Sequence, residues 1–289
     1  MMPTRRIAAD FATSRIALAG LVLLSLLLLA ALLAPWISPQ NPYDLARLDL
    51  LDSRLPPGAR SNAGAIYWLG TDDQGRDMLS AILYGLRTSV AVGFASTTLG
   101  LAIGVSLGLA TAWLGGWFDA LVMRLADLQL SFPSILIALV LLAVLGQGLD
   151  KIIVALVAVQ WAYYARTARA AALVERRKQY IDAAVALALS NARIIFRHLL
   201  PNCLPPLLVL ATVQVAAAIT LEATLSFLGL GLPITQPSLG LLISNGFNYL
   251  LSGHYWISVF PGIALLLAVV GINLVADRLR DVLDPHGQR

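Results

Sequence analysis

The sequence predicts an all-α integral membrane protein, and three observations lead to that fold class. Hydrophobic residues make up 58% of the 289 residues, and the mean hydropathy is +0.79. Charged residues make up 12%, about half of the ~25% found in ordinary soluble domains. The apolar residues fall in uncharged runs long enough to cross a bilayer as helices. A soluble fold could not cover its surface with so few charges, and this composition also excludes disorder.

The first uncharged run extends from Ile16 to Ala34 and holds 19 residues. As a helix it crosses the ~30 Å hydrocarbon core of a bilayer. Basic residues precede it, as they do in a secretory signal: Arg5, Arg6 and Arg15. However, a signal core is shorter, about 7–15 residues, and Ala34-Pro35-Trp36 makes a poor cleavage site. We therefore predict a retained first helix.

Five further spans are predicted, which gives six transmembrane helices. The fourth is the shortest and reaches only ~21 Å as a helix, so Lys151 and Arg166 must extend toward the two interfaces. Residues 223–254 carry no formal charge but contain several glycines and prolines, which favours a loop with an interfacial helix at 238–252 over a seventh crossing. The five spans are Val90–Leu114, Leu128–Leu149, Ile152–Ala165, Leu204–Leu221 and Tyr255–Ala276.

The distribution of Lys and Arg predicts the orientation of these spans. The loop at 166–201 holds seven Lys and Arg residues against two acidic ones, and the N-terminus adds three arginines. The segment at 38–85 has four Arg against six Asp, which is the opposite bias. Six spans, with both termini and the 166–201 loop in the cytoplasm, satisfy all of these biases.

Glycines mark a packing face on the second span. Gly100, Gly104 and Gly108 recur every four residues, and Gly93 lies on nearly the same face. Glycines at this spacing allow two helix backbones to approach closely. We expect this face to pack tightly, either within the bundle or at a subunit interface, although a generic membrane helix can show the same spacing.

Three charged residues fall within or beside the predicted spans. Arg124 and Asp127 are three residues apart on one helix, so we expect a structural ion pair, with a transport-pathway role as the alternative. Glu222 has no local partner in the sequence. We expect it to have a hydrogen-bonded structural role at the outer end of the fifth span.

Motifs for catalysis or metal binding are missing from the sequence. The three histidines, His198, His254 and His286, are far apart, and the lone Cys203 forms neither an internal disulfide nor a metal cluster. No phosphate-binding loop or nucleophile elbow occurs. A net charge of +4 with short, scattered basic clusters argues against nucleic-acid binding. Any energy that the protein uses must therefore come from elsewhere.

The loop at 166–201 is too long for a simple connector and predicts two short helices. In the first, Tyr180, Ala183, Ala184 and Leu187 share one face at helical spacing. They form a shallow apolar stripe that a groove of another protein could accept. A solvated charged loop is the alternative, but an exposed helix gains nothing from Tyr180 and Leu187.

The second short helix follows a break that contains an N-cap, at Ser190 or Asn191. Arg193 and Arg197 lie on one side of it, with apolar residues on another. Pro201 is expected to end it.

The spacing of Asp182-Ala183-Ala184, Ala188, His198 and Leu200-Pro201 resembles the "EAA" loop of ABC importer permeases. In that family the short helix of the loop docks in a cleft of the cytoplasmic ATPase. Asp182 replaces the usual Glu, and Ala188 replaces the usual Gly, so the turn after the first helix is expected to differ. The resemblance implies an ATPase-coupling role for Tyr180, Asp182, Ala183, Ala184, Leu187, Ala188, His198 and Pro201.

Three further blocks resemble the dipeptide, oligopeptide and nickel branch of that family. They are Leu69-Gly70-Thr71-Asp72 with Gly75-Arg76-Asp77, the segment at 222–231, and Leu279-Arg280-Asp281 with Leu283-Asp284-Pro285. The resemblance covers nearly the whole chain after about residue 16. Leu239, where Trp is common, and Ala276-Asp277-Arg278, which lacks the usual glycines, depart from the pattern.

The resemblance implies a type I ABC importer permease fold with a definite domain order. Residues 1–37 hold the N-terminal segment and first helix, and residues 38–85 form an extracytoplasmic loop. Residues 86–277 form the ABC transmembrane type-1 domain, and residues 278–289 a cytoplasmic tail. The first span with its long outer loop resembles the "C" partner of the two unlike permeases in these importers.

The resemblance also implies a multi-pass permease subunit of the bacterial cytoplasmic membrane. It would form a heterodimer with a homologous permease, bind two ABC ATPase subunits, and receive substrate from an extracytoplasmic binding protein. ATP and Mg would bind to the ATPases, and no cofactor to this chain. The expected substrate is a peptide, and nickel or another small solute is the alternative. A secondary transporter or a membrane-embedded enzyme is disfavoured, because the spans show no inverted repeat and no convergent ionisable groups.

Overall fold

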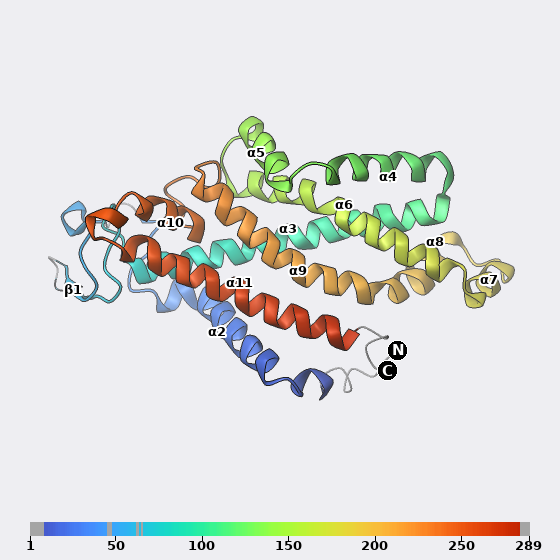
Figure 1. The fold of residues 1–289 in the computed structure, drawn as a ribbon, viewed down its shortest axis with the longest axis horizontal. Coiled ribbons are helices and arrows are strands. Elements are labelled where there is room, and N and C mark those ends of the chain that lie inside the picture. The colour runs from blue at the N-terminus through green and yellow to red at the C-terminus, as the bar shows by residue number, and fades with distance from the viewer. Residues whose placement is uncertain (1–8, 45–47, 62–63, 65, 284–289) are drawn as a thin grey trace.

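The structure is a computed structural model that describes residues 9–44, 48–61, 64 and 66–283. Its helices run along one long axis and form an elongated bundle (Figure 1). Parts of the sequence predictions lie outside the described residues, namely Arg5, Arg6, His286 and the Asp284-Pro285 part of the C-terminal motif.

Four helical stretches are long and apolar enough to cross a membrane. Three of them are α2 (Arg15–Ile37), α3 (Met78–Leu114) and α11 (Trp256–Leu283). The fourth extends over Asn191–Phe227 and contains α9 (Leu200–Phe227). Helices therefore form at the predicted first, second, fifth and sixth spans, each with longer bounds.

The predicted third span at Leu128–Leu149 is wrong as a single helix. The chain forms α4 (Gly116–Leu130) and α5 (Ser134–Leu145), which are bent by 95° at a short break. Pro133 precedes α5 and disfavours helical backbone at the residue before it, so the helix cannot continue through this point. The pair could serve as one broken span or as a re-entrant segment.

The predicted fourth span at Ile152–Ala165 lies within one longer helix, α6 (Leu149–Arg176), which extends well past Arg166 and is not among the described helices apolar enough to cross a membrane. Two of its arginines face acidic side chains of α4: Arg169 donates two hydrogen bonds to Asp119, at 2.5 and 2.6 Å, and Arg166 lies 3.6 Å from Asp127. The predicted Arg124–Asp127 pair is therefore wrong.

The glycine face of α3 packs inside the chain. A Cβ on Gly104 would lie 2.4 Å from the Trp161 carbonyl oxygen of α6, and one on Gly108 would lie 2.4 Å from the Ala165 carbonyl oxygen. Gly100 also faces α6, whereas Gly93 faces Ile219 of α9. The structure thus supports packing within the bundle rather than at a subunit interface.

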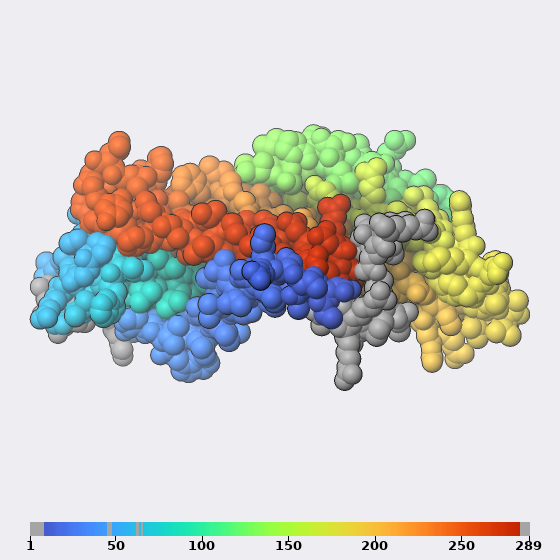
Figure 2. All heavy atoms as spheres, turned by 60° about the horizontal axis from the view of Figure 1, so that its bottom comes forward, coloured from blue at the N-terminus to red at the C-terminus, as the bar shows by residue number. Residues whose placement is uncertain are grey.

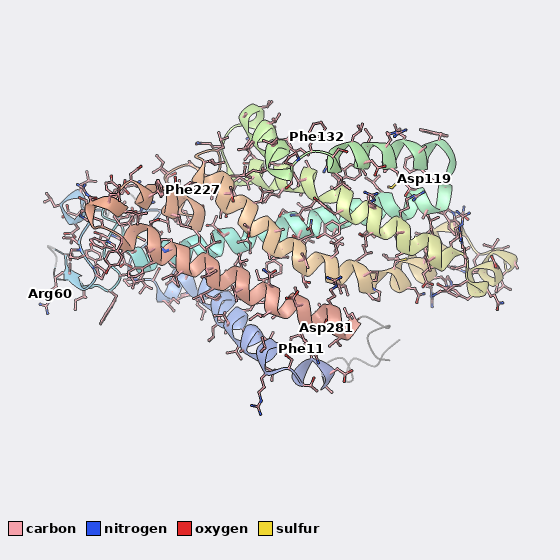
Figure 3. All side chains as sticks on the ribbon, viewed as in Figure 1. Phe11, Arg60, Asp119, Phe132, Phe227 and Asp281 are labelled. Atoms are coloured by element: carbon pink, nitrogen blue, oxygen red, sulfur yellow. The ribbon has the colours of Figure 1, made fainter. Side chains whose placement is uncertain are left out.

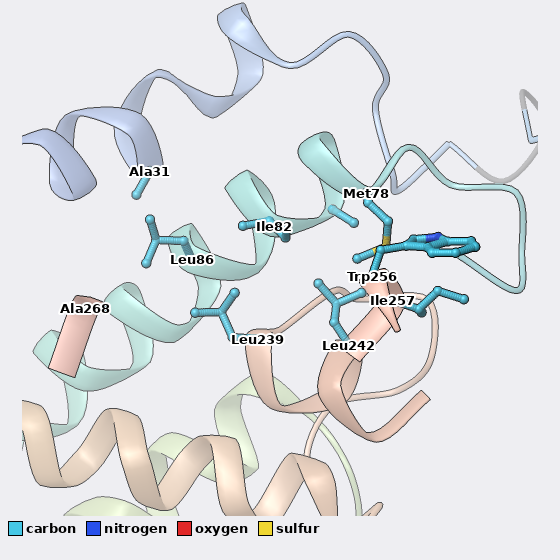
Figure 4. Close-up of a cluster of buried hydrophobic side chains, with 10 residues drawn as sticks. Ala31, Met78, Ile82, Leu86, Leu239, Leu242, Trp256, Ile257 and Ala268 are labelled. Atoms are coloured by element: carbon cyan, nitrogen blue, oxygen red, sulfur yellow. The ribbon is translucent and has the colours of Figure 1, made fainter. Parts of the chain in front are cut away.

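One end of the bundle is built from a loop and short elements. They are η2 (Leu50–Asp52), the antiparallel strands β1 (Ala59–Arg60) and β2 (Ile66–Tyr67), α10 (Leu239–Phe247) and η4 (Leu250–Ser252). With nine residues, α10 is too short to cross a membrane. A buried cluster beneath this end includes Met78, Leu239 and Trp256 (Figure 4).

The other end carries α7 (Gln179–Ala186), α8 (Asn191–Arg193) and η3 (Ile194–Leu199), a π-helix that runs into α9 (Figure 1). The prediction that Pro201 ends a separate second helix is wrong. Pro201 is the second residue of α9, and the helical stretch Asn191–Phe227 continues through it.

The two described chain ends lie together. Phe11 and Asp281 are neighbours in Figure 3, toward the end that carries α7, and Figure 2 shows α2 lying across α11 on the surface. Arg278 of α11 donates hydrogen bonds to the Asp10 carbonyl and, at 2.7 Å, to the Thr13 hydroxyl. This contact ties the beginning of the described chain to its end.

Candidate site for coupling to a partner subunit

One face of α7 anchors the helix to its own chain. Ile181 and Ala184 are buried against Ile194, and Trp113 and Leu189 pack around them. Residues three apart share a helix face, so this small cluster fixes the rotation of α7 about its axis. The sequence prediction placed Ala184 in the outward stripe, which is wrong because the cluster with Ile181 turns Ala184 inward.

The opposite face of α7 is free. Ala183 and Ala186 are exposed, and Val185 and Leu187 are 54% and 74% exposed. Asp182 is exposed beside them. A helix that presents small and apolar side chains to solvent, while its other face is firmly packed, is typical of an unpartnered docking surface.

The turn after α7 keeps a glycine-type conformation although the residue is alanine. Ala188 has a φ of +53°, in the left-handed region that L-residues disfavour. Its N–H donates to the Val185 carbonyl, and the Leu189 N–H donates to the Ala184 carbonyl, which together form a Schellman motif. The expectation that the turn would differ without glycine is therefore wrong. The surrounding contacts hold Ala188 in the strained conformation.

Tyr180 has a bracing role at the start of α7. Its hydroxyl donates to Glu175 of α6 at 2.7 Å and accepts from the side-chain amide of Asn202 at 3.2 Å. Burial and the hydrogen bond to Glu175 raise the pKa of Tyr180 to about 12, so the hydroxyl stays protonated and can donate. Glu175 and Asn202 were missed by the sequence analysis, because their partners lie on other elements.

Arg176 fixes the corner where α6 meets α3. Its guanidinium donates to the carbonyls of Ala112 and Trp113, at 2.6 and 3.0 Å, and lies 5.1 Å from the centre of the Trp113 ring. A cation that binds the last carbonyls of a helix satisfies acceptors that have no partner within that helix. Arg176 therefore holds the start of the loop that carries α7 against the end of α3.

The remaining predicted coupling residues lie on the other side of the loop. Ser190 caps α8 by accepting from the Arg193 N–H at 3.4 Å. The His198 carbonyl accepts from Asn202 at 2.7 Å, and Pro201 lies next to Asn202 in α9. The structure thus places His198 and Pro201 near the Tyr180 brace rather than on the exposed face of α7.

The motif at Leu69–Asp77 lies at the far end of the bundle and is structural. Asp72 and Arg76 form an ion pair of 2.6 Å in which both side chains are almost completely buried. Arg76 also donates to the Ile234 carbonyl before α10, at 3.2 Å. The Trp256 indole of α11 donates to the Thr71 carbonyl at 3.0 Å. The motif therefore joins three separate parts of the chain.

Glu222 is the centre of a second buried network near this end. Its carboxylate accepts from Ser89 of α3 and Ser226 of α9, each at 2.7 Å, and it also interacts with Ser238 at the start of α10. The side chain is completely buried. The expected hydrogen-bonded structural role of Glu222 agrees with this geometry. The prediction that Glu222 has no local partner is wrong, because Ser226 lies one turn later on the same helix and donates to it.

These features define a helical chain with membrane-type spans and an uncovered face on α7, and comparisons with known proteins identify its family. The model of the family "Binding-protein-dependent transport system inner membrane component" matches residues 100–287, and that of the "N-terminal TM domain of oligopeptide transport permease C" matches residues 3–57. The chain belongs to this family of ABC importer permeases. In it, ATP hydrolysis lies on separate subunits.

Several named relatives cover most of the chain. A putative peptide transport system permease protein of Brucella suis is 43% identical over 92% of this chain and 86% of its own length. A di/tripeptide transport system permease protein of Pseudomonas aeruginosa is 37% identical, over 98% and 92%. A probable D,D-dipeptide transport system permease protein of Escherichia coli is 39% identical, over 91% and 85%. The predicted family resemblance is confirmed.

A solved structure has a similar fold. The methionine ABC transporter MetNI in an inward-facing conformation contains a chain that superposes with a TM-score of 0.56 at 23% identity. The match covers 72% of this chain and 98% of that one. It supports the fold assignment.

Proposed function

We propose that this chain is one of two unlike permease subunits of a bacterial ABC importer for short peptides. Relatives at 37–43% identity carry peptide transport names over more than nine tenths of the chain. The observation that carries the mechanism is the exposed face of α7, which is presented on a helix braced from α6, α3 and α9. A cleft in an ATPase that held this face would move those three helices with it.

The proposed topology has six crossings in the cytoplasmic membrane: α2, α3, the α4–α5 pair, α6, α9 and α11. An even number agrees with the two described chain ends lying together. The Lys and Arg residues around α7 favour placing that end in the cytoplasm. The loop with β1 and β2 then faces the external binding protein.

The proposed partners are a homologous permease, two ATPases and a binding protein. ATP and Mg bind to the ATPases, and closure of the ATPase dimer displaces α7. Because α7 is packed on α3 through Trp113 and on η3, which runs into α9, through Ile194, the displacement changes how the spans pack and opens the path alternately to each side. This chain supplies the path and the contact, and no catalytic group.

A reconstitution experiment tests this function. The assembled complex in proteoliposomes, with its binding protein, is expected to accumulate labelled peptides only when hydrolysable ATP is supplied. Replacing ATP with a non-hydrolysable analogue should abolish accumulation. Uphill transport by this chain alone, without nucleotide, would contradict the proposal.

A further inference from the structure

A groove lies between α9 and α11 on a surface that none of the contacts described above uses. It has a volume of about 420 Å³ and is open on one side. Sites for small ligands typically measure about 300–1,000 Å³. The lining is mostly apolar, with three uncharged polar side chains and no charged one: Val213, Ala216, Ala217, Thr220, Leu221, Thr224, Val269 and Asn273.

The polar groups of the groove come from both helices. The hydroxyls of Thr220 and Thr224 donate to carbonyls one turn earlier in α9, at 2.9 and 2.8 Å, so their oxygen lone pairs remain available as acceptors. Asn273 of α11 is exposed, and within the described residues its amide makes no hydrogen bond. Together they offer acceptors and one donor pair between the C-terminal part of α9 and α11.

Lipid is a poor match for this surface. An amide without a hydrogen-bond partner in hydrocarbon is strongly disfavoured, because nothing there replaces water. The exposed large side chains of α11 before Asn273 are apolar, among them Ile263, Leu266 and Val270. The apolar part of α11 is therefore suited to contact lipid, whereas the groove around Asn273 must contact water, protein or a polar solute.

The chemistry of the groove fits the main chain of a peptide. Every peptide unit has one N–H donor and one C=O acceptor, whatever its side chains are. The threonine oxygens can accept from such N–H groups, and the Asn273 amide can both donate and accept. The small side chains at Ala216 and Ala217 leave room for side chains of different size. A neutral surface of this kind binds peptides without selecting for their charge.

We propose that this groove is the part of the transport path that this chain supplies, and that Thr220, Thr224 and Asn273 bind the main-chain amides of the passing peptide. The proposal rests on the proposed function, since it takes a peptide as the solute. A helix of the homologous permease is the competing occupant, and the following experiment distinguishes the two.

Accessibility of introduced cysteines tests the occupant. The background is Cys203→Ala, which removes the one native thiol, itself buried. In the assembled complex in lipid nanodiscs, Thr220→Cys and Asn273→Cys are expected to react with a small, charged methanethiosulfonate at least ~10 times faster than Leu266→Cys, an exposed position on the apolar face of α11. A mixture of peptides of two to five residues should slow the reaction. If these two cysteines do not react with the methanethiosulfonate but can be cross-linked to the homologous permease, the proposal is overturned.

Near-isosteric variants test the hydrogen bonds. Thr220→Val and Asn273→Leu are each expected to reduce ATP-driven uptake of the same peptide mixture by about 3- to 10-fold, which corresponds to the loss of one ordinary hydrogen bond. ATPase co-purification and basal ATP hydrolysis should stay unchanged. Normal uptake by the double variant would overturn the proposal. If the unmodified complex itself fails to accumulate peptides with ATP, the proposed function fails instead, whatever the cysteines show.

Discussion

The two ends of the bundle are held together in different ways. At the end with β1 and α10, buried polar groups join distant segments: the Asp72–Arg76 pair reaches the residues before α10, and Glu222 joins α3, α9 and α10. At the end with α7, the buried cluster that the structure describes beneath the helix consists of Ile181, Ala184 and Ile194. The contacts around it lie closer to solvent: half-buried Glu175 accepts hydrogen bonds from the exposed side chains of Lys178 and Tyr180.

The difference lies in how firmly each end is held. Buried hydrogen bonds and ion pairs hold the first end in one arrangement, because breaking any of them leaves an unsatisfied group. Both ends expose large apolar side chains: Leu187 and Phe196 are 74% and 67% exposed at the second end, and Leu51 and Leu251 are 80% and 103% exposed at the first. Apolar surface that the chain itself does not cover favours binding of other proteins at each end.

The largest expected contrast is in chemical accessibility across the membrane. In a Cys203→Ala background, Arg60→Cys should react with a membrane-impermeant maleimide in intact spheroplasts, whereas Leu187→Cys should react only after lysis. Both positions are exposed, Arg60 at the tip of β1 (Figure 3). The neighbouring residue Ser61 is a poorer position for the introduced cysteine, because only 9% of its surface is exposed. Reaction of Leu187→Cys in intact spheroplasts would reverse the proposed orientation.

Arg76→Ala is expected to cause the largest loss of stability at the end with β1 and α10. Removing one member of a buried ion pair typically costs about 3–5 kcal/mol, because the remaining charge has no partner. Thermal unfolding of the purified complex in detergent measures the effect. Arg60→Ala removes an exposed arginine from the same loop and should change stability by less than about 0.5 kcal/mol. Equal effects of the two variants would show that the end is not held by its buried pair.

Gly104→Val tests the seam between α3 and α6, which connects the two ends. The new Cβ would lie 2.4 Å from the Trp161 carbonyl oxygen, so the helices must separate, at a cost of about 3 kcal/mol. Gly262→Val is the matched control, because Gly262 of α11 has no atom within 4 Å of an added Cβ. Expression and melting temperature of both variants decide the matter. A Gly104→Val protein that folds as well as the unmodified chain would contradict the close packing of α3 against α6.

Ala188→Gly is expected to give the smallest effect, and a stabilising one. Glycine adopts a φ of +53° without the steric penalty that alanine has there. The local gain should be at most about 1 kcal/mol, since glycine also gives the unfolded chain more freedom. Hydrogen exchange of the α7 amides measures it. Faster exchange in the glycine variant would mean that Ala188 is not strained.

Much of the fold could be predicted from the sequence, because long uncharged runs leave a chain few alternatives to membrane helices. The errors came where distant residues decide local structure. The apolar run across Pro133 hid the bend between α4 and α5. Arg166 marked the end of a span in the sequence, yet α6 continues past it, because arginine is a good helix former and Arg166 and Arg169 face Asp127 and Asp119 of α4.

The candidate site was predicted less completely. The α7 helix and its apolar character followed from residue spacing, but an eight-residue helix with apolar residues on more than one face does not reveal which face is buried. Ile194, from beyond the turn, settles that choice by packing on Ile181 and Ala184. Ser89, a partner of Glu222, lies 133 positions away and gave no signal in the sequence.

The central claim is that the exposed face of α7 receives the ATPase, and co-purification tests it most directly. Ala183→Arg places a long charged side chain on that face, and a shallow apolar cleft cannot bury it without a partner. The variant should insert into the membrane and fold normally but lose the ATPases. The same change at Ala192, an exposed alanine of α8 outside this face, should retain them. Full recovery of the ATPases with Ala183→Arg would contradict the account.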